Sequence, residues 1–295
     1  MSEVQGASVL ERPGTVAIVG VGLIGGSIGL ALRSKGLAGR VVGIGRDAPR
    51  LEEARRLGAI DAYATDLAEG VAGAEVAVVC TPVSRLVEDA LAACRHGPGS
   101  ILVTDAGSTK ARIVEGIEAD PRGRAAFVGA HPIAGSERQG VAHARADLFE
   151  GRTCVLTPTA RTPPDRLGRA RDFWAGLGCR LIEVDPVEHD QRLARTSHLP
   201  HAVAAALAAS VPPELLGMAA GAYRDGTRVA GADAGLWAAI FRENRGPVLD
   251  ALREFESHLA TFREALEADD GARLLAWWDA AKGHRDRFEG PGLGV

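Results

Sequence analysis

Reactive side chains stand at the ends of two predicted strands in the first half of the chain. Ser108 follows the apolar run SILVT, and His131 follows AAFVG. In an open α/β sheet, ligands bind beyond the carboxyl ends of the strands, so we expect both side chains at one site. An imidazole titrates near neutrality and suits general-base catalysis, and a hydroxyl can align it with a reacting oxygen. Without chemistry, His131 would order a loop, and Ser108 with Thr109 would cap the following helix.

The second half of the chain adds a set of basic side chains. His198 and His201 are three residues apart, so they share one face of a predicted helix. Arg228 can pair with a carboxylate through two hydrogen bonds, which favours an acidic substrate; a solvated charge at a helix end is the alternative. The histidine spacing is not H-E-x-x-H and no acid completes a ligand set, so we predict no metal site.

A glycine-rich turn predicts the cofactor. The run GVGLIG follows one predicted strand and opens a predicted helix. Gly20 permits the tight turn, Gly22 lets a pyrophosphate approach the backbone, and Gly25 lets helix and strand pack closely. Free N–H groups and the helix dipole favour an anion at this helix N-terminus. We therefore predict a dinucleotide site that also includes Leu23 and Ile24.

The choice between NAD and NADP depends on the end of the second strand. NAD enzymes usually carry an acid there for the ribose 2′-OH. Gly45 occupies this position, and Arg46 and Asp47 follow. Arg46 suits a 2′-phosphate, but Asp47 can reach the ribose and Arg46 can stack on adenine, so both cofactors stay open and charge favours NADP. Thr81 and Pro82, after the third strong strand, are expected to line the same site.

The pattern of elements predicts an α/β fold with a Rossmann-like, doubly wound parallel sheet, followed by an all-helical domain. Strands are expected at 15–20, 40–44, 75–80, 100–104, 125–129, 153–157 and 179–184. From residue 187 onward only helices are expected, at 189–209, 213–224, 234–261 and 269–288, with a kink at Pro200. We expect a dinucleotide-binding domain over 1–186 and a helical substrate and dimerisation domain over 187–295.

Composition and charge limit the classes of partner. A formal net charge of -4 gives no reason to expect nucleic-acid or membrane binding. No apolar run is long enough to cross a bilayer, and the first residues do not form a signal peptide. The four cysteines form no C-x-x-C pair, so reduced thiols in a cytoplasmic protein are expected. These features predict a cytoplasmic protein without a nucleic-acid or membrane partner, and together with the predicted site they favour a small-molecule substrate.

Several longer motifs resemble one enzyme family. In order, GVGLIGGSIGLAL, TDAGSTK, HPIAGSERQG, SHLPHAVA, GTR and LWAAIFREN are similar to motifs of the prephenate dehydrogenase family, over about residues 15–255. The resemblance implies a Rossmann-like domain and a helical dimerisation domain that forms a homodimer. It also implies oxidative decarboxylation of prephenate to 4-hydroxyphenylpyruvate with NAD(P)⁺, in tyrosine biosynthesis. Arogenate, with an amino group in place of the keto oxygen, is the alternative substrate.

The resemblance also implies roles for single residues. His131 matches the catalytic base, and Ser108 matches a serine that hydrogen-bonds the substrate hydroxyl and the histidine. Arg228 matches an arginine that binds a substrate carboxylate. The other implied positions are the substrate contact His201, the site-lining Glu137 and Trp237, and the structural pair His189 and Asp190. The Gly45-Arg46 pair departs from members with Asp there, which weakens the expectation of strict NAD use.

Two rival functions leave different signatures. Two-domain dehydrogenases of the β-hydroxyacid type use a lysine base in the helical half, but residues 111–281 contain no lysine. A catalytically silent dinucleotide sensor would not need the set His131, Ser108 and Arg228. No regulatory domain is expected after the last helix, so any inhibition by tyrosine is predicted to be competitive with prephenate.

Overall fold

The computed structural model describes residues 13–135 and 138–290. The chain divides into two compact units, Met1–Asn244 and Arg245–Val295. The first unit contains the sheet and the helices up to α11, and the second contains helices α12 and α13. This division falls later in the chain than the change from mixed to purely helical structure near residue 186.

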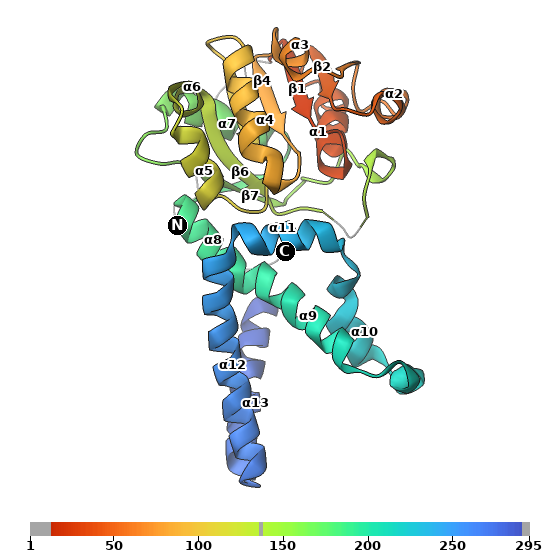
Figure 1. Cartoon of the computed structure of the whole chain (residues 1–295), viewed down its shortest axis with the longest axis vertical. Coiled ribbons are helices and arrows are strands. Elements are labelled where there is room, and N and C mark those ends of the chain that lie inside the picture. Colours follow the sequence, from red (N-terminus) through yellow and green to blue (C-terminus); the bar gives the residue numbers. More distant parts are fainter. Residues whose placement is uncertain (1–12, 136–137, 291–295) are drawn as a thin grey trace. The chain divides into compact units, whose positions relative to one another are not determined.

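The first unit is built on an eight-stranded sheet in the order β3-β2-β1-β4-β5-β6-β7-β8 (Figure 1). Every neighbouring pair is parallel except β6 and β7, which are antiparallel. The predicted Rossmann-like sheet is confirmed, with a short strand β3 and the antiparallel pair as additions that the sequence pattern did not reveal. The strands are β1 Thr15–Val19, β2 Arg40–Ile44, β3 Ala62–Ala64, β4 Val76–Val79, β5 Leu102–Asp105, β6 Phe127–Pro132, β7 Thr153–Thr157 and β8 Arg180–Glu183.

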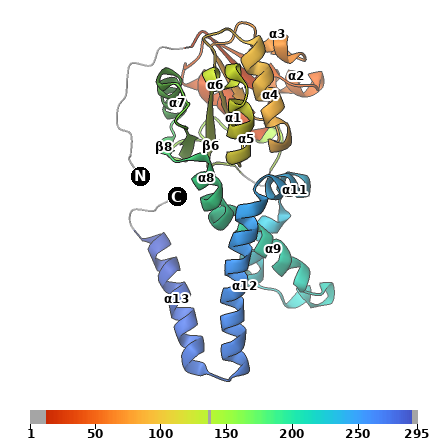
Figure 2. The same ribbon diagram turned by 60° about the vertical axis from the view of Figure 1, so that its left-hand side comes forward.

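Helices cover both faces of this sheet (Figure 2). Side chains alternate along β1, so Val16 and Ile18 join one apolar cluster while Ala17 and Val19 join the other. Helices α1, α2 and α7 contribute to the first cluster, and α3, α4 and α5 contribute to the second. The helices of this region are α1 Leu23–Ser34, α2 Ala48–Arg56, α3 Leu67–Val71, α4 Val83–His96, α5 Ala111–Glu118, α6 Pro121–Ala126 and α7 Pro164–Gly176.

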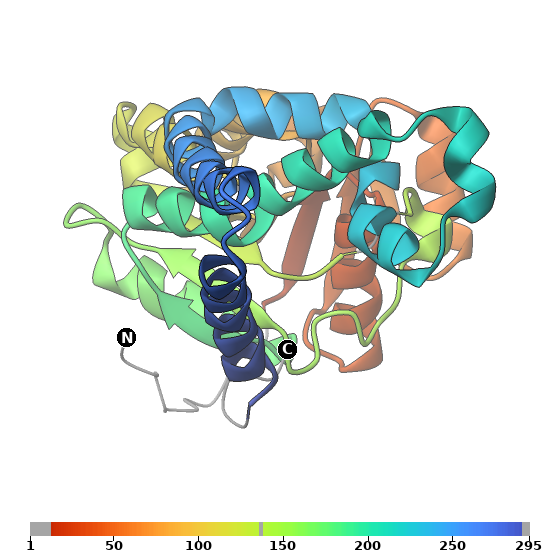
Figure 3. The same cartoon turned by 90° about the horizontal axis from the view of Figure 1, so that it is seen from below.

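The last part of the first unit is helical, as expected. Its elements are α8 Pro186–Leu193, a π-helical turn Ala194–His198, α9 Leu199–Ser210, α10 Gly221–Thr227 and α11 Ala234–Glu243, with 3₁₀ turns at Pro213–Met218 and Arg228–Gly231. Pro200 is the second residue of α9, and the wide turn before it accommodates the missing N–H at this point. Helix α11 lies beside the α8–α9 segment (Figure 3), and ring contacts of Trp237 join the two.

The second unit is a pair of antiparallel helices, α12 Arg245–Glu267 and α13 Gly271–Glu289 (Figure 2). Trp277 holds them together by donating a hydrogen bond to the carbonyl of His258 at 3.2 Å and by a ring contact with Phe262. The prediction of one helix over 234–261 is wrong, because the helix ends before Asn244, whose side chain bonds elsewhere. Within the described ranges, no helix is both long and apolar enough to cross a membrane.

Candidate active site

The glycine turn after β1 has the geometry that a dinucleotide needs. Gly20 has φ +92°, and a Cβ there would lie 3.0 Å from the carbonyl of Cys80. A Cβ on Gly22 would meet nothing within 4 Å, whereas one on Gly25 would lie 2.2 Å from the carbonyl oxygen of Gly20. The three glycines therefore provide the turn, the open approach and the close packing that the sequence predicted.

Further features beside this turn fit a bound dinucleotide. Helix α1 begins at Leu23, and no side chain caps its N-terminus and no acid lies in its first turn. The backbone N–H groups of Leu23 and Ile24 are thus available to an anion. The buried hydroxyl of Thr81 has no hydrogen-bond partner among the described residues, and its backbone nitrogen lies next to Gly20. Pro82 immediately precedes the following helix, α4. The site lies where the sheet order reverses, between β1 and β4.

The residues after β2 differ in their freedom to bind the cofactor. The carboxylate of Asp47 caps α2 by accepting a hydrogen bond from the backbone N–H of Arg50 at 3.1 Å. It also lies 3.3 Å from the guanidinium of Arg50. Arg46 is exposed and makes no hydrogen bond or ion pair with the described part of the chain. Asp47 is therefore already engaged, and Arg46 is the side chain left to interact with a ligand.

His131 lies inside β6, not after it. The sequence suggested a strand ending at residue 129, but β7 pairs with β6 up to Pro132 and places His131 opposite Val155. The side chain of His131 is only 8% exposed. Its Nδ1 lies 2.9 Å from Nε2 of His189 in α8. Among the described residues, no hydrogen bond occupies Nε2 of His131, so this nitrogen is the one available to a ligand.

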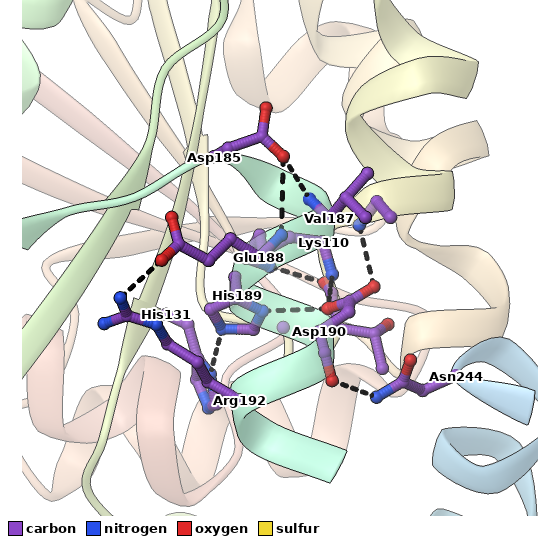
Figure 4. A network of polar contacts seen from close by, with 12 residues as sticks. Lys110, His131, Asp185, Val187, Glu188, His189, Asp190, Arg192 and Asn244 are labelled. Carbon is purple, nitrogen blue, oxygen red and sulfur yellow. Dashed lines mark hydrogen bonds and ion pairs between the residues drawn. The ribbon is translucent and has the colours of Figure 1, made fainter. Parts of the chain in front are cut away.

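A buried hydrogen-bonded chain extends from His131 to the start of α5 (Figure 4). Nδ1 of His189 lies 2.8 Å from Oδ1 of Asp190. The two oxygens of Asp190 also accept hydrogen bonds from the backbone N–H groups of Lys110 at 2.7 Å and Ala111 at 2.9 Å. The pairing of His189 with Asp190 that the family resemblance implied is confirmed. The same carboxylate caps α5, a role that the sequence had suggested for Ser108 and Thr109.

The side chain of Lys110, whose backbone N–H binds Asp190, forms a fully buried ion pair. Nζ of Lys110 is 2.5 Å from Oδ2 of Asp105, and neither side chain is exposed to solvent. Asp105 also accepts hydrogen bonds from the backbone N–H groups of Gly107 and Ala130, and Lys110 donates to the carbonyl of Thr109. Each charge is thus satisfied inside the protein, as buried charges require. Sequence reasoning missed this pair, although both residues lie in the motif TDAGSTK.

Burial favours the neutral form of the three imidazoles of His131, His189 and His198. Burial lowers the pKa of His131 well below 6.5, and the nearby His189, Lys110 and His198 lower it further. Burial also lowers the pKa of His189, although the hydrogen bond to Asp190 opposes this. Burial lowers the pKa of His198 to about 4. A neutral imidazole with one free ring nitrogen can act as a base at physiological pH.

His198 in the π-helical turn, His201 in α9 and Trp237 in α11 form a second group, an aromatic wall. The ring of His201 stacks on Trp237 with centroids 3.6 Å apart, and His198 meets the edge of the same indole at 6.0 Å. The two histidines therefore share one helix face, as predicted. His201 Nδ1 donates to the carbonyl of Ser197 at 3.0 Å, which leaves its Nε2 as an acceptor.

The charged Arg228 and the buried Asn244 are two further polar side chains on the helical side of the site. Arg228 is exposed. Burial lowers the pKa of His201, the hydrogen bond to Ser197 raises it, and the positive charge of Arg228 lowers it further. Asn244 is buried, and its Nδ2 donates to the carbonyl of Asp190 at 2.8 Å and lies 3.0 Å from Nδ1 of His198. Asn244 ties the His189–Asp190 pair to the aromatic wall. No local pattern predicted this link, although Asn244 lies in the motif LWAAIFREN.

For two expected site residues, Ser108 and Glu137, the structure gives no contact with the site. Ser108 is half-buried in the loop between β5 and α5, and its hydroxyl makes no hydrogen bond within the described ranges. It therefore does not hold His131 here, and His189 has that position. Glu137 lies outside the described residues. Within those residues, no group of three or more His, Cys, Asp or Glu side chains is arranged to hold a metal ion.

The fold and the site together define the class of protein. A Rossmann-like sheet, a glycine turn at its switch point and a buried neutral histidine in β6 of the same sheet are the parts of a dinucleotide-dependent dehydrogenase. Residues 28–183 match the family model "Prephenate dehydrogenase, nucleotide-binding domain". Residues 185–280 match "Prephenate dehydrogenase, dimerization domain". The chain belongs to the prephenate dehydrogenase family and is an NAD(P)-dependent dehydrogenase.

Individual relatives cover nearly the whole chain. A prephenate dehydrogenase of Bacillus subtilis (strain 168) is 34% identical over 282 residues, which are 92% of this chain and 75% of that protein. A cyclohexadienyl dehydrogenase of Zymomonas mobilis is 31% identical, over 88% of this chain and 91% of that protein. The crystal structure of prephenate dehydrogenase from Aquifex aeolicus in complex with hydroxyphenyl propionate and NAD⁺ has a TM-score of 0.87 and 32% identity, over 93% of this chain and 98% of that one.

Proposed function

We propose that the chain is a prephenate dehydrogenase of tyrosine biosynthesis, with His131 as the general base. The observation that carries the proposal is the buried imidazole of His131, whose Nδ1 is held by His189 and whose Nε2 is free for a ligand. The relatives named above support this choice of substrate through their own names. We assign dinucleotide binding to residues 1–186 and substrate binding and dimerisation to residues 187–295.

The reaction assigns a distinct task to His131. NAD(P)⁺, when bound, supplies an acceptor for hydride. The O–H bond at C4 of the ring breaks and its proton passes to Nε2 of His131, while the hydrogen on C4 leaves with both electrons. The carbon–carbon bond between the ring and its carboxylate then breaks and CO₂ leaves. The electron pair of that bond stays in the ring, which becomes an aromatic phenolate. His131 returns the proton to the phenolate oxygen, so the protein ends in its starting state.

A direct assay tests the proposed substrate. The purified chain, supplied with NADP⁺ or NAD⁺, should reduce the cofactor with prephenate and release one CO₂ per cofactor reduced. The same assay with arogenate measures the alternative substrate. A higher kcat/KM for arogenate would replace prephenate as the substrate. No turnover of either compound would remove the proposed activity while leaving the fold and the cofactor site unaffected.

We expect Arg228 to bind a carboxylate of the substrate. Its charge acts on His201, whose ring stacks on Trp237. We propose that these three residues line one pocket, while Ser108 hydrogen-bonds the C4 hydroxyl. Because a hydrogen bond to a charged group contributes about 1.5–3 kcal/mol, Arg228→Ala should raise KM for prephenate by roughly 10–100-fold. Arg224→Ala removes an exposed arginine nearby, which is paired with Asp225, and should leave KM unchanged. A wild-type KM in Arg228→Ala would exclude Arg228 from the pocket.

We propose that NADP⁺ is the preferred cofactor. Arg46 is exposed with no partner in the described structure, whereas Asp47 is engaged as the cap of α2. A guanidinium pairs well with a phosphate, so NADP⁺ should bind more tightly than NAD⁺, and Arg46→Ala should abolish the difference. Calorimetric Kd values measure this without turnover. Arg40→Ala, at the opposite end of β2, is the matched control. Tighter binding of NAD⁺ by the wild type would refute the preference.

We propose that two copies of the chain associate through the helical region. Large apolar side chains are exposed on α12 and α13, among them Leu266 at 58%, Leu275 at 63% and Trp278 at 65%. Apolar surface of this kind is characteristic of an interface, and residues 185–280 match a dimerization-domain model. Light scattering after gel filtration should give a dimer for the wild type and for Leu57→Glu, an exposed apolar position on the first unit. Trp278→Glu should shift the protein towards the monomer, and an unchanged dimer would place the interface elsewhere.

The state of the cysteines bears on the cellular compartment of the protein. All four cysteines are free thiols, and none is paired in a disulfide in the residues that the structure covers. Free thiols are typical of a reducing compartment, so we propose that the enzyme acts in the cytoplasm.

A further inference from the structure

We propose that His189 and Asp190 are positioning residues that fix the tautomer of His131, so that its Nε2 is the unprotonated nitrogen facing the substrate. This inference rests on the proposed role of His131 as the base. The sheet supplies the base, and α8 supplies the groups that decide which of its two nitrogens is basic.

The direction of the hydrogen bonds begins at Asp190. Both of its oxygens accept from backbone N–H groups, those of Lys110 and Ala111, which can only donate. A proton on either oxygen would therefore face a donor, so both oxygens act as acceptors. The short contact between Oδ1 and Nδ1 of His189, 2.8 Å, then requires the proton to be on Nδ1 of His189.

The same logic passes on to His131. A neutral imidazole carries one N–H, so His189 with a proton on Nδ1 presents an unprotonated Nε2. That Nε2 lies 2.9 Å from Nδ1 of His131, and a hydrogen bond between them needs the proton on Nδ1 of His131. The remaining nitrogen of His131, Nε2, is therefore unprotonated. Figure 4 shows His131, His189 and Asp190 in one continuous line of contacts.

Burial makes this order costly to reverse. His189 is fully buried and Asp190 almost so, so solvent does not replace a lost hydrogen bond. The reversed tautomer of His131 would leave two acceptors, Nδ1 of His131 and Nε2 of His189, facing each other in the protein interior. Asn244 holds the backbone of Asp190 from the other side, which keeps the pair in register with His131.

Two substitutions of His189 separate tautomer control from simple packing. In His189→Gln, the amide oxygen can take the place of Nε2 and still accept from His131. In His189→Asn, the shorter amide can reach Asp190 but leaves Nδ1 of His131 without its acceptor. The partner that orients a metal-ligating imidazole typically contributes about 10–100-fold, and loss of the group that fixes the tautomer of a catalytic imidazole costs about 10⁴-fold. The value of kcat should therefore fall by about 10–10⁴-fold in His189→Asn. His189→Gln should recover most of the loss, and both variants should bind NADP⁺ with the wild-type Kd.

Nitrogen NMR of the histidine rings in the wild-type protein reads the tautomer directly. With histidine labelled at both ring nitrogens and the His131 signals assigned by their loss in His131→Asn, Nδ1 should give a protonated, pyrrole-type signal and Nε2 a pyridine-type signal. A proton on Nε2 of the resting enzyme would overturn the inference, as would a kcat in His189→Asn within twofold of the wild type. The NMR result does not depend on turnover, so failure of the proposed activity is distinguished from failure of the tautomer assignment.

Discussion

His131→Asn is expected to reduce kcat for prephenate by about 10²–10⁴-fold, the usual contribution of a positioned general base. Asparagine keeps a polar group near Nδ1, where His131 meets His189, but it has no basic nitrogen to take the substrate proton. The glycine turn that would hold the cofactor is formed by other residues, so Kd for NADP⁺ should stay at the wild-type value. Steady-state kinetics and calorimetry on the same preparation measure both quantities.

His143→Asn serves as the control for this experiment, because His143 is exposed in the 3₁₀ turn Val141–His143. It should behave as the wild type. If His131→Asn retained kcat within a few fold, His131 would not be the base.

The pH dependence of the wild type adds a second readout on the same residue. The base must be neutral, and the pKa of His131 lies well below 6.5 because of its burial and the nearby His189, Lys110 and His198. Hence kcat/KM should stay level as the pH falls to 6.5 and should decline only below it. An acid limb centred above pH 6.5 would contradict the assignment.

Lys110→Met is expected to lower the free energy of unfolding by about 3–5 kcal/mol, because removing one partner of a buried ion pair leaves an uncompensated charge. Lys110 and Asp105 are both fully buried, and methionine fills most of the volume without replacing the positive charge. Lys282→Met, which breaks an exposed pair with Asp286, should change stability by less than about 1 kcal/mol. Urea denaturation of both variants measures the difference.

A loss below about 1 kcal/mol in Lys110→Met would mean that the pair is not needed for stability. The variant also tests the electrostatic role of Lys110 if it remains folded. Its positive charge lowers the pKa of His131, so removing it should raise that pKa. The acid limb of kcat/KM should therefore move to higher pH in Lys110→Met.

Local patterns were sufficient to predict the sheet and the cofactor turn. The seven predicted strands follow from short apolar runs, and the roles of Gly20, Gly22 and Gly25 follow from their spacing between a strand and a helix. These features depend on neighbours in the sequence. The antiparallel pairing of β7 does not, and it is this pairing that extends β6 to Pro132 and places His131 within the strand.

Contacts between distant residues explain what the sequence did not reveal. Asp190 caps a helix that begins about 80 positions earlier, at the backbone of Lys110 and Ala111. Asn244 follows the last residue of α11, and its side chain donates to the backbone carbonyl of Asp190 in α8. Neither position has a local pattern that would predict these bonds. His189 and Asp190 were foreseen as a pair only through the family resemblance, and their contact with His131 emerged from the fold.

A crystal structure with NADP⁺ and the aromatic product bound tests the account most directly. If His131 takes the proton of the C4 hydroxyl, its Nε2 should lie within about 2.6–3.2 Å of the phenolic oxygen. His189 should still contact Nδ1 of His131 in that complex. A phenolic oxygen bound by other side chains, with Nε2 of His131 turned away from it, would contradict the account.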